Sequence, residues 1–306
     1  MVKDIPISNV HLSLSDSQAI GELRYQILSI SLISPDRLMT PEDLRSLMLP
    51  TGIDATGGVV ISGRAPIWLY TYLVHELHPT AWVACYDPRL GAVVVTTHSR
   101  QVQTGQVIPL ILSQGRPQLG PALLVVGPPD SGKSVLSHAL FQALLPDFPE
   151  VFLQRAQWDG EGNWILELPD TATEDDREAF KLAYKGELTK AFYPYQAQVI
   201  LQLRRQKPLV IVDVGGRVQP QKLPVLEACS HYLIISSQPD EVKKWHEFCR
   251  DRGNLRCVAV VASTLDKIEM IHRREPFLEM TCGPWVSGAF NRVPEVLLGE
   301  VRSLLT

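Results

Sequence analysis

The segment that most constrains the fold of this chain is GPPDSGKS at residues 127–134. It satisfies the pattern G-x-x-x-x-G-K-[ST], follows the apolar run ALLVVG and precedes the helical pattern SVLSHALFQALL. Such a loop needs this strand-to-helix context, because backbone N–H groups and the helix N-terminus together bind phosphate oxygens. The segment therefore predicts a nucleotide-binding α/β domain.

The positions of this loop have separate predicted roles. Glycine lets the backbone curl around a phosphate without a Cβ clash, Lys133 reaches the β- and γ-phosphates, and Ser134 ligates Mg²⁺. A second Mg²⁺ anchor is expected at the end of a neighbouring apolar strand, and Asp213 in LVIVDV supplies it. The predicted nucleotide-binding residues are Gly127, Asp130, Ser131, Gly132, Lys133, Ser134 and Asp213.

The residues after Asp213 bear on what happens to the nucleotide. They are Val214, Gly215 and Gly216, so no glutamate follows that would polarise a water for rapid hydrolysis. The order also satisfies D-x-x-G, whose last glycine N–H can sense a γ-phosphate in switch or kinase-like proteins. A guanine-reading N-K-x-D is missing after the last apolar strand, where residues 263–266 read STLD. ATP is favoured over GTP only by default.

The chain has 306 residues, which at roughly 150 residues per domain suggests two domains. The segment SQGRPQLGP separates two strand-like runs with residues that cannot continue regular structure. We expect one domain over residues 1–112, a linker over 113–120 and the P-loop domain over 121–306. In the latter, strands at 122–127, 151–156, 209–214, 232–237 and 257–263 alternate with helices, one of them running through Phe192, which predicts a mainly parallel sheet.

The first domain is predicted to be a small α/β unit with a mixed sheet. Strand patterns occur at 25–33, 57–63, 81–87 and 92–99, and helix patterns at 40–48 and 66–78. In the second helix, Tyr70, Val74 and Leu77 are expected to face the core.

Composition excludes several classes of protein. Lys and Arg number 29 against 33 Asp and Glu, so the formal charge of −4 argues against a long nucleic-acid-binding stripe. No apolar run reaches the roughly 18 residues of a membrane span, and the N-terminal segment lacks a secretory pattern. Five cysteines without a C-x-x-C pair favour reduced thiols over disulfides or zinc. We expect a cytoplasmic protein.

Polar side chains gather at the ends of elements in the first domain. Ser62, Gly63 and Arg64 form a turn between a strand and a helix, which favours anion binding. Asp87 and Arg89 end the next strand, and the helix between these strands carries Trp68, Thr71, His75 and His78 in one stripe, with His98 and Ser99 as outer candidates. Two histidines near an aspartate suit either a manganese ion, with His75, His78 and Asp87 as ligands, or general acid and base chemistry on phosphodiesters.

These residues also carry a family resemblance. ISGRAPIWLY, LVHELHPTAWVACYDPRLGAVVV and THS resemble the manganese-dependent ring nucleases of type III CRISPR defence, which degrade cyclic tetra-adenylate. The match is dense over residues 57–99 and looser toward TPEDL. It implies His78, Asp87 and Arg89 as catalytic residues, His75 as a further candidate, and Ser62, Gly63 and Arg64 as ligand-binding residues. The resemblance also implies a homo-oligomer built from dimers, and fusion to a C-terminal P-loop domain of the kind called AAA-like.

The sequence thus favours a ring nuclease joined to an ATP-binding domain with Mg²⁺. Three alternatives stay open at this point: a sensor that binds the cyclic adenylate and gives an ATPase or kinase output, a metal-dependent exoribonuclease acting on linear RNA tails, and a P-loop kinase with a structural N-terminal domain. Arg155, Arg204, Arg205 and Arg217 are candidates for stabilising phosphate charge.

Overall fold

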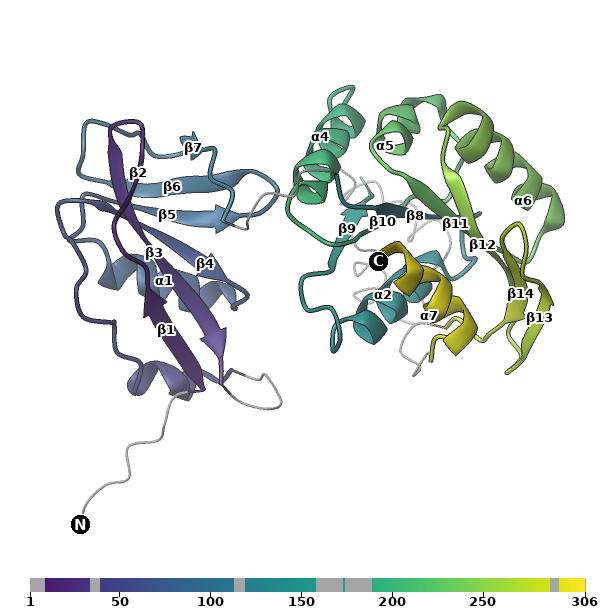
Figure 1. Cartoon of the computed structure of the whole chain (residues 1–306), viewed down its shortest axis with the longest axis horizontal. Helices are drawn as coiled ribbons and strands as arrows, with labels where there is room; N and C mark the ends of the chain where they lie inside the picture. The colour runs from purple at the N-terminus through teal and green to yellow at the C-terminus, as the bar shows by residue number, and fades with distance from the viewer. Residues whose placement is uncertain are drawn as a thin grey trace, which may run out of the picture. The chain divides into compact units, whose positions relative to one another are not determined.

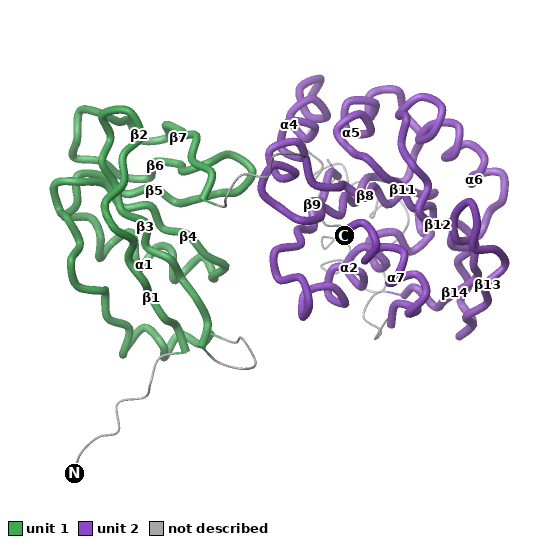
Figure 2. Tube along the Cα trace, in the orientation of Figure 1, with its two compact units in different colours: residues 1–113 green, residues 114–306 purple. Residues whose placement is uncertain are grey.

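A computed structural model describes residues 9–33, 39–112, 119–157, 173, 189–286 and 292–305. Internal contacts divide the chain into two compact units, Met1–Ser113 and Gln114–Thr306 (Figure 2). Each unit is described by itself below.

Unit 1 is built on one mixed sheet (Figure 1). The strand order is β1-β3-β4-β5-β6-β7, with β2 paired to β3. β3, β4 and β5 are parallel neighbours, and the other pairings are antiparallel. Its elements are β1 (Val10–Leu14), β2 (Gln18–Ile20), β3 (Leu23–Leu32), η1 (Pro41–Arg45), β4 (Gly58–Gly63), α1 (Ile67–Glu76), β5 (Trp82–Asp87), β6 (Gly91–Thr97) and β7 (Val107–Ile108).

The helix α1 connects the parallel strands β4 and β5 and covers one face of this sheet. Leu69, Leu73 and Leu77 recur every four residues and are buried against that face. Tyr70 and Val74, which we expected in the core, are only partly buried beside this row. The reason is the helical period, which gives the fully buried stripe to the leucines.

The predicted helix at 40–48 is a shorter 3₁₀ turn, η1. Its first residues are capped, because the backbone N–H of Thr40 donates to Asp43 Oδ2 at 2.8 Å. Asp43 Oδ1 also accepts from the backbone N–H of Asn9 at 2.9 Å. These hydrogen bonds lower the pKa of the buried Asp43 carboxyl below its ordinary value. The turn is therefore fastened to the strand β1 by a buried carboxylate.

Unit 2 is a second α/β layer structure with helices on both faces of its sheet (Figure 1). Its strands are β8 (Ala122–Val126), β9 (Phe152–Ala156), β10 (Val210–Val214), β11 (His231–Ser236), β12 (Arg256–Ser263), β13 (Glu269–Arg273) and β14 (Leu278–Cys282). Its helices are α2 (Lys133–Leu144), α4 (Phe192–Arg204), η3 (Pro220–Lys222), α5 (Leu223–Glu227), α6 (Pro239–His246), the π-helical η4 (Glu247–Arg252), α7 (Glu295–Arg302) and η5 (Ser303–Leu305).

The strand order in unit 2 is β13-β14-β12-β11-β8-β10-β9. All pairings are parallel except that of β13 with β14, so the prediction of a mainly parallel sheet is confirmed. β8 leads into the loop of residues 127–134, called the phosphate loop below. It is hydrogen-bonded directly to β10, which carries Asp213. No strand lies between them, so their carboxyl ends meet at one edge, where ligands bind in such sheets.

Alternate residues of the central strands serve two cores. Leu124 and Val212 face α4, α5 and α6, whereas Leu123 and Ile211 face α2 and α7. The helix expected to run through Phe192 lies largely outside the described residues. In the described part, α4 instead begins at Phe192, and Pro194 is tolerated in its first turn because N–H groups there have no intrahelical partner.

All five cysteines are free thiols, as the sequence predicted. Among the described helices, none combines the length and the hydropathy that crossing a membrane requires.

Candidate functional site

At one end of the sheet in unit 1, Ser62 and Gly63 are the last two residues of β4, and Arg64 begins the connection to α1. These three residues are called the phosphate turn below. The parallel register of β4 and β5 pairs Ile61 with Cys85, so Gly63 lies alongside Asp87. Gly63 has a φ of +143°, and an added Cβ would come within 2.5 Å of the Ile30 carbonyl oxygen. Only glycine fits there.

Tyr70 is a residue of this end that we had assigned to the core. Its hydroxyl donates to the carbonyl oxygen of Gly63 at 2.6 Å. Burial, together with the nearby Cys85 and Asp87, raises the pKa of Tyr70 to about 12. The hydroxyl therefore stays protonated and holds the phosphate turn at neutral pH. The available sequence signal was the position of this tyrosine in the first turn of the helix that follows the phosphate turn.

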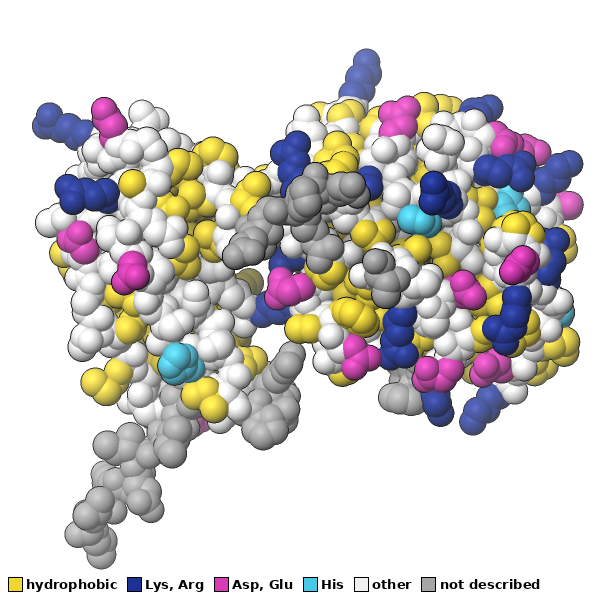
Figure 3. Space-filling model, viewed as in Figure 1, with side chains coloured by type: hydrophobic (Ala, Val, Ile, Leu, Met, Phe, Trp, Pro, Cys, Tyr) yellow, Lys and Arg dark blue, Asp and Glu magenta, His cyan; other side chains and the backbone are white. Residues whose placement is uncertain are grey.

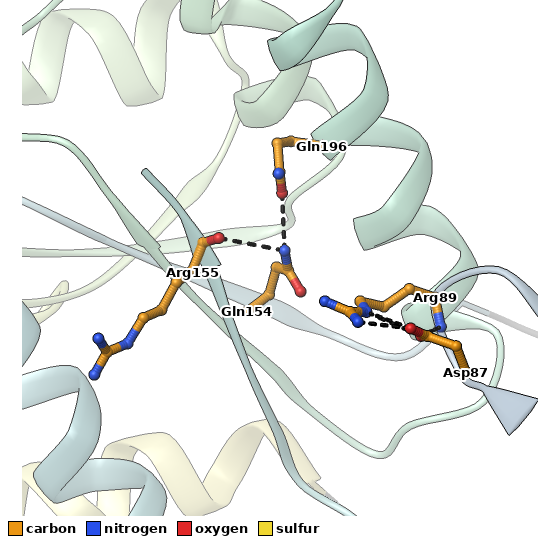
Figure 4. A network of polar contacts seen from close by, with 5 residues as sticks. All are labelled: Asp87, Arg89, Gln154, Arg155 and Gln196. Carbon is orange, nitrogen blue, oxygen red and sulfur yellow. Dashed lines mark hydrogen bonds and ion pairs between the residues drawn. The ribbon is translucent and has the colours of Figure 1, made fainter. Parts of the chain in front are cut away.

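Asp87 and Arg89 form a forked ion pair at the same end (Figure 4). Arg89 Nη2 donates to Asp87 Oδ2 at 2.6 Å, and Arg89 Nε donates to Oδ1 at 2.9 Å. Burial pushes the pKa of Asp87 upward, but the hydrogen bonds and charge of Arg89 outweigh it and hold that pKa below its usual range. Arg64, the last residue of the phosphate turn, is exposed. This end of the sheet thus offers an ionised carboxylate and two guanidinium groups.

The other end of the same sheet carries the histidine cluster, formed by His75, His78 and His98. The rings of His75 and His78 stack with centroids 6.1 Å apart, and the ring of His98 meets that of His78 edge-on at 6.1 Å. His98 Nε2 lies 3.1 Å from the carbonyl oxygen of His78, and His78 Nδ1 lies 3.2 Å from that of His75. The sequence placed His98 as an outer candidate, and the structure brings it into contact with His78.

The two ends of the sheet are separated by the length of β5. The histidine cluster precedes Trp82, whereas Asp87 closes the strand, a rise of about 16 Å at 3.3 Å per residue. The expectation that His75, His78 and Asp87 meet is therefore wrong within one copy of the chain. It failed because α1 runs antiparallel to β5, so its last turn lies at the start of that strand. Among the described residues, no three His, Cys, Asp or Glu side chains are grouped to hold a metal ion.

The phosphate loop of unit 2 has the backbone that the motif predicts. Gly127, Asp130 and Gly132 have φ angles of +154°, +56° and +90°. A Cβ on Gly127 would clash with the Ile235 carbonyl, and one on Gly132 would meet Trp285 Cβ at 2.6 Å. The loop thus curls as a cradle at the N-terminus of α2.

Lys133 is 7% exposed, and its ammonium donates to the carbonyl oxygen of Pro128 at 2.6 Å. Burial lowers the pKa of Lys133, and Asp213 and Asp130 oppose that shift. The Oγ atom of Ser131 is buried within the loop without a hydrogen-bond partner among the described residues. A phosphate oxygen in the cradle would accept from both groups.

Beside the loop, three polar side chains converge from α2, β10 and the end of β9. Gln157 Nε2 donates to Ser134 Oγ at 3.2 Å, and both side chains hydrogen-bond to Asp213. Burial raises the pKa of Asp213, although these bonds and the charges of Lys133 and Arg155 oppose it. Within the described residues, Asp213 Oδ1 is buried with no partner. An orphaned carboxylate oxygen beside a serine hydroxyl fits the donor set of Mg²⁺.

The sequence analysis missed Gln157. The usable signal was its position, because it is a polar residue that directly follows β9, the strand beside β10 and Asp213. The register pairs Arg155 with Asp213, which carries Gln157 past the strand end toward the loop. On the opposite side of β9, Gln154 points away and donates to Gln196 Oε1 at 2.8 Å (Figure 4).

The D-x-x-G segment lies against the phosphate loop. A Cβ on Gly216 would come within 2.6 Å of the Pro129 nitrogen and 3.0 Å of Lys133 Nζ, so a side chain there would press on the loop. The buried Lys222 donates from Nζ to the carbonyl oxygens of Gly215 and Arg217 at 2.6 and 2.5 Å. Lys222 therefore fixes the backbone of the D-x-x-G segment beside the phosphate loop.

The arginine candidates separate into two groups. Arg204 donates to the carbonyl oxygens of Gly120 and Ala228, at the amino ends of β8 and β11, and Arg205 follows it. These two lie away from the phosphate loop, because the loop follows the carboxyl end of β8. The charge of Arg155 is close enough to Asp213 to oppose the rise in the pKa of that carboxyl. Lys222 holds the carbonyl of Arg217 next to the phosphate loop.

Comparison with known proteins places the site of unit 1 in a family. Residues 32–109 match the model of the family described as CRISPR-associated protein (Cas_csx3). An uncharacterised protein of Aquifex aeolicus is 46% identical over 76 residues, which are 24% of this chain and 68% of that protein. The chain belongs to this CRISPR-associated family through its first unit. The matched segment contains the phosphate turn, the ion pair and the histidine cluster.

Solved structures resemble parts of the chain more distantly. MinD of Pyrococcus horikoshii in complex with Mg-ADP is 13% identical with a TM-score of 0.35, covering 47% of this chain and 70% of that one. A plasmid partition protein of Borrelia burgdorferi bound to AMPPNP is 9% identical with a TM-score of 0.41, covering 61% and 98%. The kinase domain of the Escherichia coli tyrosine kinase ETK is 16% identical with a TM-score of 0.34, covering 46% and 67%. Similarities this low carry no functional argument.

Proposed function

We propose that the chain is a ring nuclease that cleaves cyclic tetra-adenylate and thereby switches off type III CRISPR signalling, joined to an ATP-binding P-loop unit. The observation that carries the proposal is the end of the sheet in unit 1, where the phosphate turn, Asp87 and Arg89 lie together inside the segment that matches the CRISPR-associated family. A small ring with four phosphates needs a few converging guanidinium groups, which agrees with the formal charge of −4.

In this mechanism each residue has a separate part. The phosphate turn and the guanidinium of Arg89 bind the phosphates, and Tyr70 keeps the turn in place. Asp87, kept ionised by Arg89, accepts a hydrogen bond from the attacking oxygen and orients it. His78 transfers a proton as acid or base, a part that imidazole side chains commonly take in catalysis.

These parts come together only between two copies of the chain. Since the histidine cluster and Asp87 lie at opposite ends of β5, one copy supplies His78 and another supplies Asp87 and Arg89. This supports the homo-oligomer that the family resemblance implies. The side chains of one copy do not fit a manganese ion held by His75, His78 and Asp87, and no step is assigned to that metal.

The P-loop unit binds ATP with Mg²⁺ in this proposal. Ser134 and Asp213 would hold the metal, with the amide of Gln157 beside them, and Lys133 would leave the Pro128 carbonyl to bind the β- and γ-phosphates. Bound Mg²⁺ would neutralise charge on the phosphate oxygens. The Gly216 segment, lying against the loop, is placed to sense a γ-phosphate.

The proposal is tested by mass spectrometry of products after incubation with cyclic tetra-adenylate and manganese, with a chelator control. We expect linear adenylate fragments that disappear with the Asp87→Ala variant. A ring that survives in all samples contradicts the nuclease assignment.

A sensor is the second candidate, and the separation of His78 from Asp87 within one copy favours it. In that case the ring stays intact, while ATP turnover by the P-loop unit changes when the ring is added. Parallel measurement of ring and ATP concentrations distinguishes the two functions.

A further inference from the structure

Lys222 is a buried lysine beside the phosphate loop. Lys and Arg side chains stand out on the face of unit 2 that Figure 3 shows, whereas Lys222 is only 2% exposed. Its ammonium donates to the carbonyl oxygens of Gly215 and Arg217 at 2.6 and 2.5 Å. A buried charge needs such hydrogen bonds, because they replace the water that it has lost. The two carbonyls belong to the residues on either side of Gly216.

The backbone of Lys222 is anchored in the core of unit 2. Lys222 ends η3 and directly precedes α5, which packs beside α4 (Figure 1). Val225 and Leu226 of α5 are 0% exposed in the core that these helices share with the sheet. The ammonium is therefore held by a well-packed element, and it limits how far residues 215–217 can move.

Gly216 brings this segment against the phosphate loop. An added Cβ would lie 2.6 Å from the Pro129 nitrogen and 3.0 Å from Lys133 Nζ. In loops of this pattern the lysine reaches the β- and γ-phosphates, so Gly216 lies beside the group that would hold the third phosphate of ATP. Residues 215–217 thus contact Lys133 through Gly216 and Lys222 through the two flanking carbonyls.

We propose that Lys222 is a positioning residue for the γ-phosphate. By holding the carbonyls on both sides of Gly216, it keeps this glycine against the phosphate loop and so sets the preference of unit 2 for ATP over ADP. The inference rests on the proposed binding of ATP by unit 2 and on the proposed sensing of the γ-phosphate by the Gly216 segment. ADP has no γ-phosphate, so its binding does not need the position of Gly216 that Lys222 maintains.

The alternative is a purely structural role for Lys222. Its ammonium would then only satisfy two carbonyls, and its loss would weaken the fold and the binding of both nucleotides alike. The two roles differ in which complex they affect. The ratio of the ATP and ADP affinities therefore separates them, whereas a measurement of stability does not.

The substitution Lys222→Met in the full-length chain tests the proposal, because it removes the N–H donors and keeps an unbranched side chain. Calorimetry with Mg²⁺ measures the dissociation constants of ADP and of AMPPNP, an ATP analogue that resists hydrolysis. We expect the AMPPNP affinity to fall about tenfold, as for one lost hydrogen bond to a charged group, and the ADP affinity to change less than about twofold.

Lys207→Met is the matched control. Lys207 donates to Glu150 and precedes β10 at the amino end of that strand, away from the phosphate loop. Its loss also removes a lysine from unit 2 together with a hydrogen bond. We expect the ratio of the AMPPNP and ADP affinities in this variant to equal that of the unsubstituted chain.

A second variant keeps the test decisive if Lys222→Met does not fold, which its thermal unfolding and the loss of ADP binding would report. Lys222→Gln keeps N–H donors on a shorter side chain, so it should fold and show the same selective loss in smaller degree. The proposal is overturned if the folded variant loses AMPPNP and ADP affinity by the same factor, or loses neither. An unsubstituted chain that binds neither nucleotide refutes the ATP-binding function itself, whereas equal losses in the variants refute only the role of Lys222.

Discussion

Two inactive variants are expected to restore ring cleavage when they are mixed. His78→Ala removes the proton-transferring imidazole at one end of β5, and Asp87→Ala removes the carboxylate at the other, about 16 Å away along the strand. Neither residue can serve the same bond within one copy. A composite site takes its histidine from one copy of the chain and its aspartate from another. Each variant alone therefore lacks one half of every such site.

The extent of recovery follows from how a composite site draws its residues. A site is active only if the copy that donates the histidine carries Asp87→Ala and the copy that donates the aspartate carries His78→Ala. With random exchange of equal amounts, about one quarter of sites satisfy both conditions, whichever symmetric oligomer forms. A site built within one copy gives no recovery at all.

A mixture of the unsubstituted chain with the double variant provides a matched control. Composite sites then keep about one quarter of the activity, because both donors must be intact, whereas sites within single copies keep about one half. The assay is the rate of linear adenylate formation at constant total protein after subunit exchange. Zero activity in the first mixture together with one half in the second would refute the reasoning from the strand.

Three further predictions concern single side chains. Tyr70→Phe should raise the KM for the ring about fivefold through loss of about 1 kcal/mol of hydrogen bonding to the phosphate turn, whereas Tyr72→Phe on the same helix should not, as steady-state kinetics will show. Gln157→Leu should weaken Mg²⁺-dependent ATP binding about tenfold, since it removes a partner of Ser134 and Asp213, the two side chains that would hold the metal. Calorimetry measures this change, and Gln142→Leu on the exposed side of α2 is the control. Asp43→Ala should lower the free energy of unfolding by about 2 kcal/mol at pH 7. Because folding lowers the pKa of Asp43 from 3.8, its contribution is present above that pH and lost as pH falls below it, so urea denaturation at pH 3 should show a much smaller difference.

Local motifs predicted much of the architecture. The phosphate loop, its glycines and the alternation of strands with helices specified unit 2, because each depends on residues near in sequence. The less regular pieces were not predicted, including β1, β2, β7, β13 and α7. β13 shows why, since its five exposed residues carry no buried alternation and become a strand only by pairing with β14.

The site divides in the same way. The sequence by itself determined which groups are present: the phosphate turn, the Asp87 and Arg89 pair, the histidines, and the glycines and lysine of the phosphate loop. Only the tertiary structure decided which of them meet. The direction of α1 separates His78 from Asp87, the strand register brings Gln157 to Ser134 and Asp213, and the packing of α1 turns Tyr70 toward Gly63. Proximity between distant residues follows from the course of the backbone and the pairing of strands, and local residue patterns do not encode it.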